Sequence, residues 1–258
     1  EFRRVLFRSD NRFCNAEYVK VLASLNGWQK RAWFEGDWDI AAGQFFTMFR
    51  REVRGIGDFD DSRAVEWFAA LDYGFTHYTV CLLGCKDGDG NVFVVDEHAE
   101  RLWLPQRHAA GIRAMLARHT MGAGGNRRSL QISDLRRFVA GADVFSRQSD
   151  GTTIAGQYAK LGINVRCANT DRVNGWAEVL QRLGDVEAGI RPTLFIHQRC
   201  GRLLETLPAL QHDPNRPEDV LKVDADEDGA GGDDAADALR YLVASKTREI
   251  VVRKLRGL

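Results

Sequence analysis

The chain has 258 residues, of which 44% are hydrophobic and 28% are charged. This composition is typical of a globular protein with a substantial core. Lys and Arg together number 36, and so do Asp and Glu, so the balance of charge excludes a bulk attraction to nucleic acid. No apolar run approaches the roughly 20 residues of a membrane span, and no signal peptide is visible. We therefore expect no membrane partner.

The five cysteines are scattered and form no CxxC pair. This pattern argues against a disulfide scaffold and a zinc site, and it fits a reducing compartment.

The first nine residues have a sequence that does not fit the rest of the protein. Residues 1–9 resemble the translation of a sequencing adapter, so we exclude them from fold reasoning and expect the natural protein to begin further upstream. Residues 16–34 have the spacing of a helix. Gln44–Phe49 is expected to be a short aromatic strand or turn.

The remaining elements alternate between strands and helices. Apolar runs predict strands over 65–71, 78–84 and 92–95, with a turn at 86–91 between the last two. Helices are then expected over 104–118, 153–161, 173–187 and 201–210, with strands over 137–143, 163–167 and 193–196 between them. An acidic loop spans 212–232, and a last helix runs to about Lys246. The predicted fold is α/β, with a mixed sheet of an antiparallel meander followed by parallel strands, flanked by helices on both faces.

Acidic residues are placed where such a fold would bring them together. Asp72 and Asp143 each end an apolar strand, and Asp233, Asp234 and Asp237 share one face of the last helix. Carboxylates crowded in this way are unfavourable unless a cation lies among them. Oxygen ligands favour Mg²⁺ or Mn²⁺, and two such ions are suited to phosphodiester hydrolysis. Each Asp also has an ordinary explanation, as a turn residue or as a helix N-cap.

Several short motifs occur in one order along most of the chain. They are Gly36-Asp37-Trp38, Gln44-Phe45-Phe46, Asp72-Tyr73-Gly74, Ala142-Asp143-Val144-Phe145, Asn169, Gly175-Trp176, His197-Gln198-Arg199-Cys200 and the segment from Asp233 to Tyr241. Together they resemble the C-terminal nuclease domain of the tailed-bacteriophage terminase large subunit. The resemblance implies an RNase H-like fold and a metal-dependent endonuclease that cuts double-stranded DNA concatemers during genome packaging.

The resemblance also implies roles for the acids. Asp72 is the first-strand acid, Asp143 the second, and Asp234 and Asp237 are the ligands from the helix. Asp234 stands where family members often carry His, which leaves open whether Asp233, Asp234 or both contact metal. The implied cofactors are Mg²⁺ or Mn²⁺, as two ions.

The resemblance divides the chain into four parts, of which the first is the adapter-like stretch 1–9. Residues 10–62 are a connector remnant from a missing ATPase domain, 63–247 are the nuclease domain, and 248–258 are a basic tail. No GxxxxGK[ST] phosphate loop occurs, so we expect no ATPase activity. The implied partners are double-stranded DNA, the portal, the small terminase subunit and the protein's own ATPase domain, in the host bacterial cytoplasm.

Several other residues are candidates for a functional role, and each of them also has an ordinary structural explanation. Arg118, Arg127 and Arg128 surround a Gly-rich loop and are candidate DNA contacts, or simply a solvated loop. Glu97 supports the site or is a surface acid. His77 and His98 are proton shuttles or surface residues.

Two acidic segments mimic calcium loops. Residues 224–229 resemble the opening of an EF-hand loop but are better explained as a solvated loop, and 87–91 as a hairpin turn. Two functional alternatives remain: a non-catalytic DNA-gripping and docking module of the packaging motor, and another RNase H-like enzyme such as a transposase or resolvase.

Overall fold

A computed structural model describes residues 20, 43–49, 55–122, 126–186 and 188–244. The stretch 1–9, the motif Gly36-Asp37-Trp38, the basic tail 248–258 and, apart from Lys20, the helix predicted over 16–34 lie outside these residues. None of the described helices is long and apolar enough to cross a membrane.

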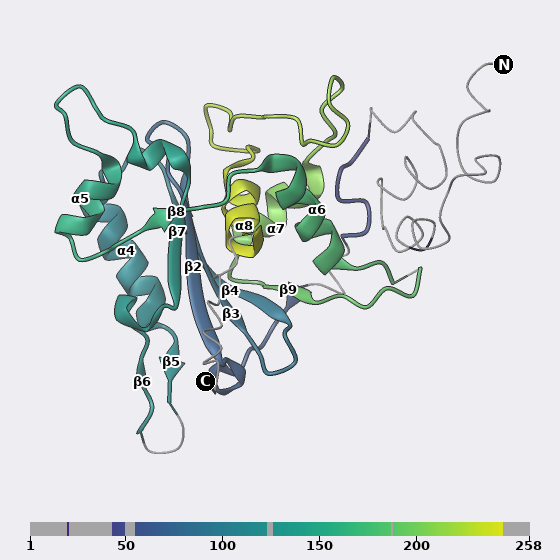
Figure 1. The fold of residues 1–258 in the computed structure, drawn as a ribbon, viewed down its shortest axis with the longest axis horizontal. Coiled ribbons are helices and arrows are strands. Elements are labelled where there is room, and N and C mark those ends of the chain that lie inside the picture. The colour runs from purple at the N-terminus through teal and green to yellow at the C-terminus, as the bar shows by residue number, and fades with distance from the viewer. Residues whose placement is uncertain (1–19, 21–42, 50–54, 123–125, 187, 245–258) are drawn as a thin grey trace, which may run out of the picture.

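A seven-stranded mixed sheet forms the centre of the fold (Figure 1). Its strands, in the order β1-β9-β4-β3-β2-β7-β8, are Gly55–Ile56, Leu194–His197, Val92–Glu100, Thr79–Lys86, Glu66–Asp72, Arg137–Ala140 and Arg166–Cys167. The central strands β2, β3 and β4 are antiparallel. Strands β7, β8, β9 and β1 join them in parallel. The predicted order of a meander followed by parallel strands is confirmed.

Helices cover both faces of this sheet, as Figure 1 shows with α4 and α5 on one side and α6, α7 and α8 on the other. Their bounds are Pro105–Ala117, Ile154–Lys160, Arg172–Leu183, Gly201–Thr206 and Asp234–Ala244. A two-stranded ribbon of β5 (Thr120–Met121) and β6 (Arg128–Ser129) extends beyond α4. Short 3₁₀ turns occupy Asp61–Arg63 (η3), Ile132–Asp134 (η5), Ala142–Phe145 (η6) and Leu207–Ala209 (η7).

Strand β2 lies between two hydrophobic cores because its side chains alternate between the faces of the sheet. Phe68 and Ala70 pack in the core beneath α8, whereas Trp67, Ala69 and Leu71 pack in the core beneath α4. Burial on both faces explains why the strand is a continuous apolar run in the sequence instead of an alternating one.

Residues 43–49 belong to the same core as α6 and α8. Gln44–Phe49 forms a turn, in which Phe45 and Phe46 are fully buried and lie edge-on to the ring of Trp176. The Phe45 amide donates to the Leu210 carbonyl at 2.8 Å. Part of the predicted connector therefore completes the core, and the division of the chain at residue 62 stays a prediction.

Several predicted elements are shorter in the structure than in the prediction. The strand predicted over 163–167 is only Arg166–Cys167, and the one predicted to reach Asp143 ends at Ala140. The helix predicted over 173–187 ends at Leu183, because Gly184 takes a left-handed φ of 63°. The helix predicted over 201–210 changes to 3₁₀ geometry around Pro208, which has no N–H to continue an α-helix.

Candidate functional site

Two parallel strands bring Asp72 and Asp143 to one edge of the sheet. Asp72 is the last residue of β2, and β7 runs beside it with Leu71 opposite Ala140. The chain leaves β7 through Gly141 and enters the η6 turn, which holds Asp143. A Cβ atom on Gly141 would lie 2.5 Å from Oδ1 of Asp143. Glycine at this position therefore leaves room for the carboxylate.

The start of α8 supplies the other acids. The helix packs against β2, β3 and α6 through small and aliphatic side chains such as Ala235, Ala238 and Leu239, which are fully buried. It begins directly after Asp233, whose carbonyl accepts from the Asp237 amide at 2.9 Å. Gly231 and Gly232 precede it with left-handed φ angles of 73° and 96°. This backbone, which glycine adopts without strain, turns the chain into the helix.

The electrostatics of the acids show that they lie within interaction range of one another. The pKa of Asp72 is raised well above its ordinary value by burial and by the charges of Asp237, Asp234, Asp143 and Asp233. Burial, followed by the charge of Asp237, raises the pKa of Asp233 to about 6. Burial likewise raises the pKa of Asp234, and partial desolvation raises the pKa of Asp143, whose side chain is still exposed to solvent. The structure therefore brings together all five acids that the sequence singled out.

Two of these carboxylates have buried oxygens that accept no hydrogen bond. They are Oδ2 of Asp233 and Oδ2 of Asp234. An unsatisfied buried acceptor is costly, and a hard cation is the partner that would satisfy such oxygens. Asp143 is exposed at the same edge, so the cluster is accessible from solvent. By donor type and by these unsatisfied oxygens, the residues suit Mg²⁺ or Mn²⁺.

Asp237 differs from the other acids because cationic side chains surround it. Its Oδ1 accepts from Arg240 at 2.9 Å, and its Oδ2 lies 3.3 Å from Arg172 and 3.9 Å from Nζ of Lys222. Arg172 also pairs with Asp219 at 2.9 Å. These contacts balance the charge of Asp237, and the role of this residue as a metal ligand stays a prediction.

The carboxylates are near one another without forming a finished coordination shell. Among the residues that the structure describes, no group of three or more His, Cys, Asp or Glu side chains is arranged to hold a metal ion. Binding a cation would therefore require the carboxylates to turn toward a common point.

Arg202 fixes the loop that leads into α8. Its guanidinium donates to the carbonyls of Gly229 and Gly231 and stacks on the ring of Tyr78, with Cζ 3.5 Å from the ring centroid. One of its nitrogens lies 3.9 Å from Oδ2 of Asp234. Arg202 thus anchors the backbone before the helix and lies close to one of its acids.

Glu97 supports this arrangement from the neighbouring strand. Its two carboxylate oxygens accept from the backbone amides of Arg202 and Leu203, both at 2.9 Å. These amides belong to the first turn of α7, where an acid is favourable. The first turn of α7 therefore holds the Glu97 carboxylate in place. Because Glu97 accepts from the backbone amide of Arg202, it also helps to position Arg202 beside Asp234.

The three arginines predicted to contact DNA each have a carboxylate partner. Arg118 pairs with Asp96 at 2.8 Å, Arg128 with Asp134 at 2.6 Å, and Arg127 lies 3.6 Å from Asp60. All three are also about half exposed. Their role in binding DNA stays a prediction.

The two candidate proton shuttles have different surroundings. His98 is buried, and its Nε2 lies 3.0 Å from Nδ1 of His108. Burial lowers the pKa of both histidines to about 4. His77 is exposed, with Nδ1 3.7 Å from Asp224. A role for either as a proton shuttle stays a prediction.

The two segments that mimic calcium loops use their acids to form turns. Oδ1 of Asp226 accepts from the Ala230 amide at 2.8 Å. Oδ1 of Asp87 accepts from the amides of Asp89 and Asn91 at 3.0 and 2.9 Å. Asp side chains that accept from nearby backbone amides in this way are typical of turns. This agrees with the interpretation of 224–229 as a solvated loop and of 87–91 as a hairpin turn.

Sequence reasoning missed three cationic residues of this site: Arg172, Arg202 and Lys222. Arg172 begins α6, Arg202 lies in the first turn of α7, and Lys222 belongs to the acidic loop. Isolated basic residues carry no motif, and only the packing of α6 and α7 beside α8 brings them to the acids. The crowding of like charges nevertheless indicates that a cationic side chain should lie near Asp237.

Comparison with known proteins supports one fold. No protein-family model matches the sequence, and no curated protein sequence matches it. The large terminase of a thermophilic bacteriophage, in complex with ATP-gamma-S, superposes with a TM-score of 0.66 at 16% identity, covering 92% of this chain and 54% of that one. The P22 large terminase nuclease domain superposes with a TM-score of 0.58 at 14% identity, covering 80% and 93%. The chain thus spans about half the length of the thermophilic phage protein. Its RNase H-like sheet, with acids at the end of β2, in η6 and at the start of α8, has the fold of a phage large terminase nuclease domain.

Proposed function

We propose that this chain is a metal-dependent endonuclease domain that cleaves double-stranded DNA concatemers during phage genome packaging. One observation carries the proposal: five aspartates, from the end of β2, the η6 turn and the start of α8, lie close together at one solvent-accessible edge of the sheet. The fold shared with phage large terminases supports the same function.

The residues proposed to hold the cofactor are Asp72, Asp143, Asp237 and one or both of Asp233 and Asp234. We propose two Mg²⁺ or Mn²⁺ ions as the ligands of this site. Divalent ions bound there would supply an activated water and stabilise the leaving oxygen of the phosphodiester. The aspartates themselves would hold the site in place, and their mutual repulsion would make it depend strongly on the cation.

Lys222, which lies beside Asp237 together with Arg172, has a second role in this proposal. The side chain of Lys222 is 70% exposed. A flexible ammonium group at the rim of the carboxylates can turn outward to a phosphate group of DNA. It would then give up its contact with Asp237, while Arg172 and Arg240 stay beside that carboxylate.

Plasmid cleavage with Mg²⁺ or Mn²⁺ tests the proposal. Asp72→Asn and Asp143→Asn are expected to abolish cleavage, whereas Asp150→Asn, which changes an acid in an exposed turn, should not. Chelation with EDTA should also abolish it. Cleavage that persists in Asp72→Asn would falsify the proposal.

A non-catalytic role in gripping DNA is the second candidate. The observation that favours it is the unfinished coordination shell, together with the arginine already bound to Asp237. Salt-sensitive binding of duplex DNA without nicking at high Mn²⁺ would support this role. Strand transfer or junction-selective cleavage would instead indicate a transposase or a resolvase.

The proposed function implies further partners. As part of a packaging enzyme the chain would act in the host bacterial cytoplasm, together with an ATPase domain, the portal and the small terminase subunit. Copurification of the chain with a separately expressed portal or small subunit would test these partners.

A further inference from the structure

A basic surface lies along the β7–β8 side of the sheet, from the start of β7, which is far from the carboxylates, to Arg166 on β8, which is nearer to them. Two adjoining hollows of about 740 and 580 Å³ open there, and both are lined by Arg136 and Arg137. Six basic residues and one acid line them: Lys86, Arg113, Arg136, Arg137, Arg166 and Arg182, with Glu66. We call these six residues the basic edge. Such an excess is unusual in a chain with equal numbers of acidic and basic residues.

Part of this positive charge is balanced within the protein. Arg137 lies 3.4 Å from Glu66, and Arg182 lies 2.9 Å from Glu178. Arg136 and Arg166 are exposed, and no carboxylate in the described part of the chain pairs with either. These two guanidinium groups are therefore available to an external anion.

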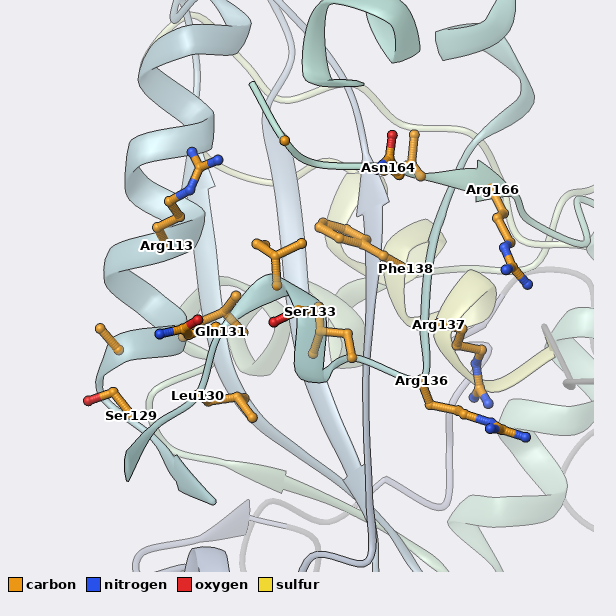
Figure 2. Close-up of a pocket in the computed structure, with 16 residues that line it drawn as sticks. Arg113, Ser129, Leu130, Gln131, Ser133, Arg136, Arg137, Phe138, Asn164 and Arg166 are labelled. Carbon is orange, nitrogen blue, oxygen red and sulfur yellow. The ribbon is translucent and has the colours of Figure 1, made fainter. Parts of the chain in front are cut away.

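The orientation of the side chains supports a common ligand. Figure 2 shows Arg136, Arg137 and Arg166 pointing away from α4, while Phe138 points toward it. Arg166 lies on the outermost strand β8, and its neighbour β7 begins at Arg137. Arg136 and Arg166 thus lie at an open edge of the sheet, where a long ligand would meet no other element of the sheet. The guanidinium of Arg137 instead lies over the ring of Phe68 and donates to the Leu242 carbonyl of α8.

The distance to the carboxylates limits what that ligand can be. Glu66 and Asp72, the two ends of β2, are separated by six steps of about 3.3 Å, or about 20 Å. The Arg136 amide donates to the Trp67 carbonyl near the Glu66 end. Arg166 lies opposite Val139, which pairs with Ala70, so along the strand direction it is only about 7 Å from the level of Asp72. Helix α8 connects the same two regions, from Asp234 beside the acids to Leu242 beside the second hollow. A ligand that touches both regions must carry regularly spaced negative charge over about 20 Å.

We propose that the basic edge binds the phosphate backbone of the duplex whose scissile bond lies at the carboxylates. This inference rests on the proposed function. Phosphates along one strand are spaced by about 3.4 Å of helix axis, so the contacts of Arg166 and Arg136 would fall about two and five base pairs from the cut. Planar guanidinium groups match phosphate geometry. An acidic polypeptide would offer charge to the same surface but has no reason to reach the aspartates as well.

Fluorescence anisotropy tests the proposal with the full 258-residue chain and a labelled duplex of about 30 base pairs in EDTA. The variants are Arg136→Ala/Arg166→Ala and the charge reversal Arg136→Glu/Arg166→Glu. Arg216→Ala, which changes an exposed arginine outside both hollows, is the control. Affinity should fall at least about tenfold in the double Ala variant, and the slope of log K against log salt should decrease by about 2. The charge-reversal variant should lose more duplex affinity than the double Ala variant.

A second measurement separates this proposal from the proposed function. With Mn²⁺, cleavage of the same duplex by the double Ala variant should need more DNA to saturate, whereas Asp72→Asn should bind DNA in EDTA as well as the wild type and cut nothing. Absence of cleavage in every protein would reject the nuclease function and leave the basic edge supported by the anisotropy data.

Three outcomes would overturn the basic edge as a DNA contact. One is absence of duplex binding by the wild type. Another is unchanged affinity and salt slope in both double variants while metal-dependent cleavage proceeds. The third is loss of poly-glutamate binding, with duplex binding intact, which would assign the surface to an acidic polypeptide.

Discussion

Replacing Asp233 by Asn should stabilise the protein in the absence of divalent metal. The Asp233 side chain is buried, its Oδ2 accepts no hydrogen bond, and the charges of Asp237 and Asp234 oppose its ionisation. Its pKa is about 6 in the folded protein, against 3.8 as the ordinary value. That difference corresponds to about 3 kcal/mol of unfolding free energy lost at neutral pH when the carboxylate is ionised.

The pH dependence of this effect has a definite sign. A carboxylate whose pKa is raised by folding binds its proton more tightly in the folded state, so its penalty is absent below pH 3.8. The penalty grows between pH 3.8 and about 6 and is fully present above that range. The stability difference between Asp233→Asn and the wild type should therefore be about 3 kcal/mol at about pH 7.5 and vanish near about pH 4.

Urea denaturation in EDTA at about pH 4, 5.5 and 7.5 measures this difference, with the exposed Asp150→Asn as the control. Adding saturating Mn²⁺ should stabilise the wild type more than the variant, because a ligand stabilises the state that binds it. The reasoning is wrong if Asp233→Asn is no more stable than the wild type at neutral pH in EDTA, or if its advantage does not shrink on acidification.

Three further changes probe the neighbouring contacts. Arg202→Lys keeps the charge but cannot anchor both glycine carbonyls. It should lower the unfolding free energy by about 1–3 kcal/mol and weaken Mn²⁺ binding measured by calorimetry; unchanged values for both would contradict the anchoring role. His119 lies between two carboxylates, and although burial opposes its charge, their hydrogen bonds raise its pKa. The wild type should be more stable than His119→Gln by its full margin below pH 6.5, and this margin should decline as the pH rises through the raised pKa. Urea denaturation on both sides of that range measures the margin. A margin that grows with pH would be inconsistent with this account. Gly141→Ala would place a Cβ atom 2.5 Å from the Asp143 carboxylate and should reduce DNA cleavage more than about tenfold with little loss of helicity by circular dichroism, whereas Gly88→Ala, with open space around it, should cleave like the wild type.

The sequence predicted the order of the main elements because their hydrophobic patterns are local. The apolar runs at β2, β3 and β4 and the turn at 86–91 indicated the meander, and the helices predicted over 153–161 and 173–187 begin within one residue of the predicted starts. Boundaries were less well predicted where tertiary packing or a single glycine decides them. The short β8 and the 3₁₀ turn at Asp143 are examples.

By itself the sequence determined the alternation of strands and helices, and which acids follow a strand or begin a helix, since these are properties of neighbouring residues. Only the tertiary structure decided that Asp237 shares its charge with Arg172 and Lys222, whereas Arg240 is a local partner three residues along the same helix. It also placed Arg136 and Arg166, which pair with no carboxylate among the residues that the structure describes, together at one edge of the sheet. Electrostatic energy depends on distances through space, and a pattern of residues along the chain does not contain those distances.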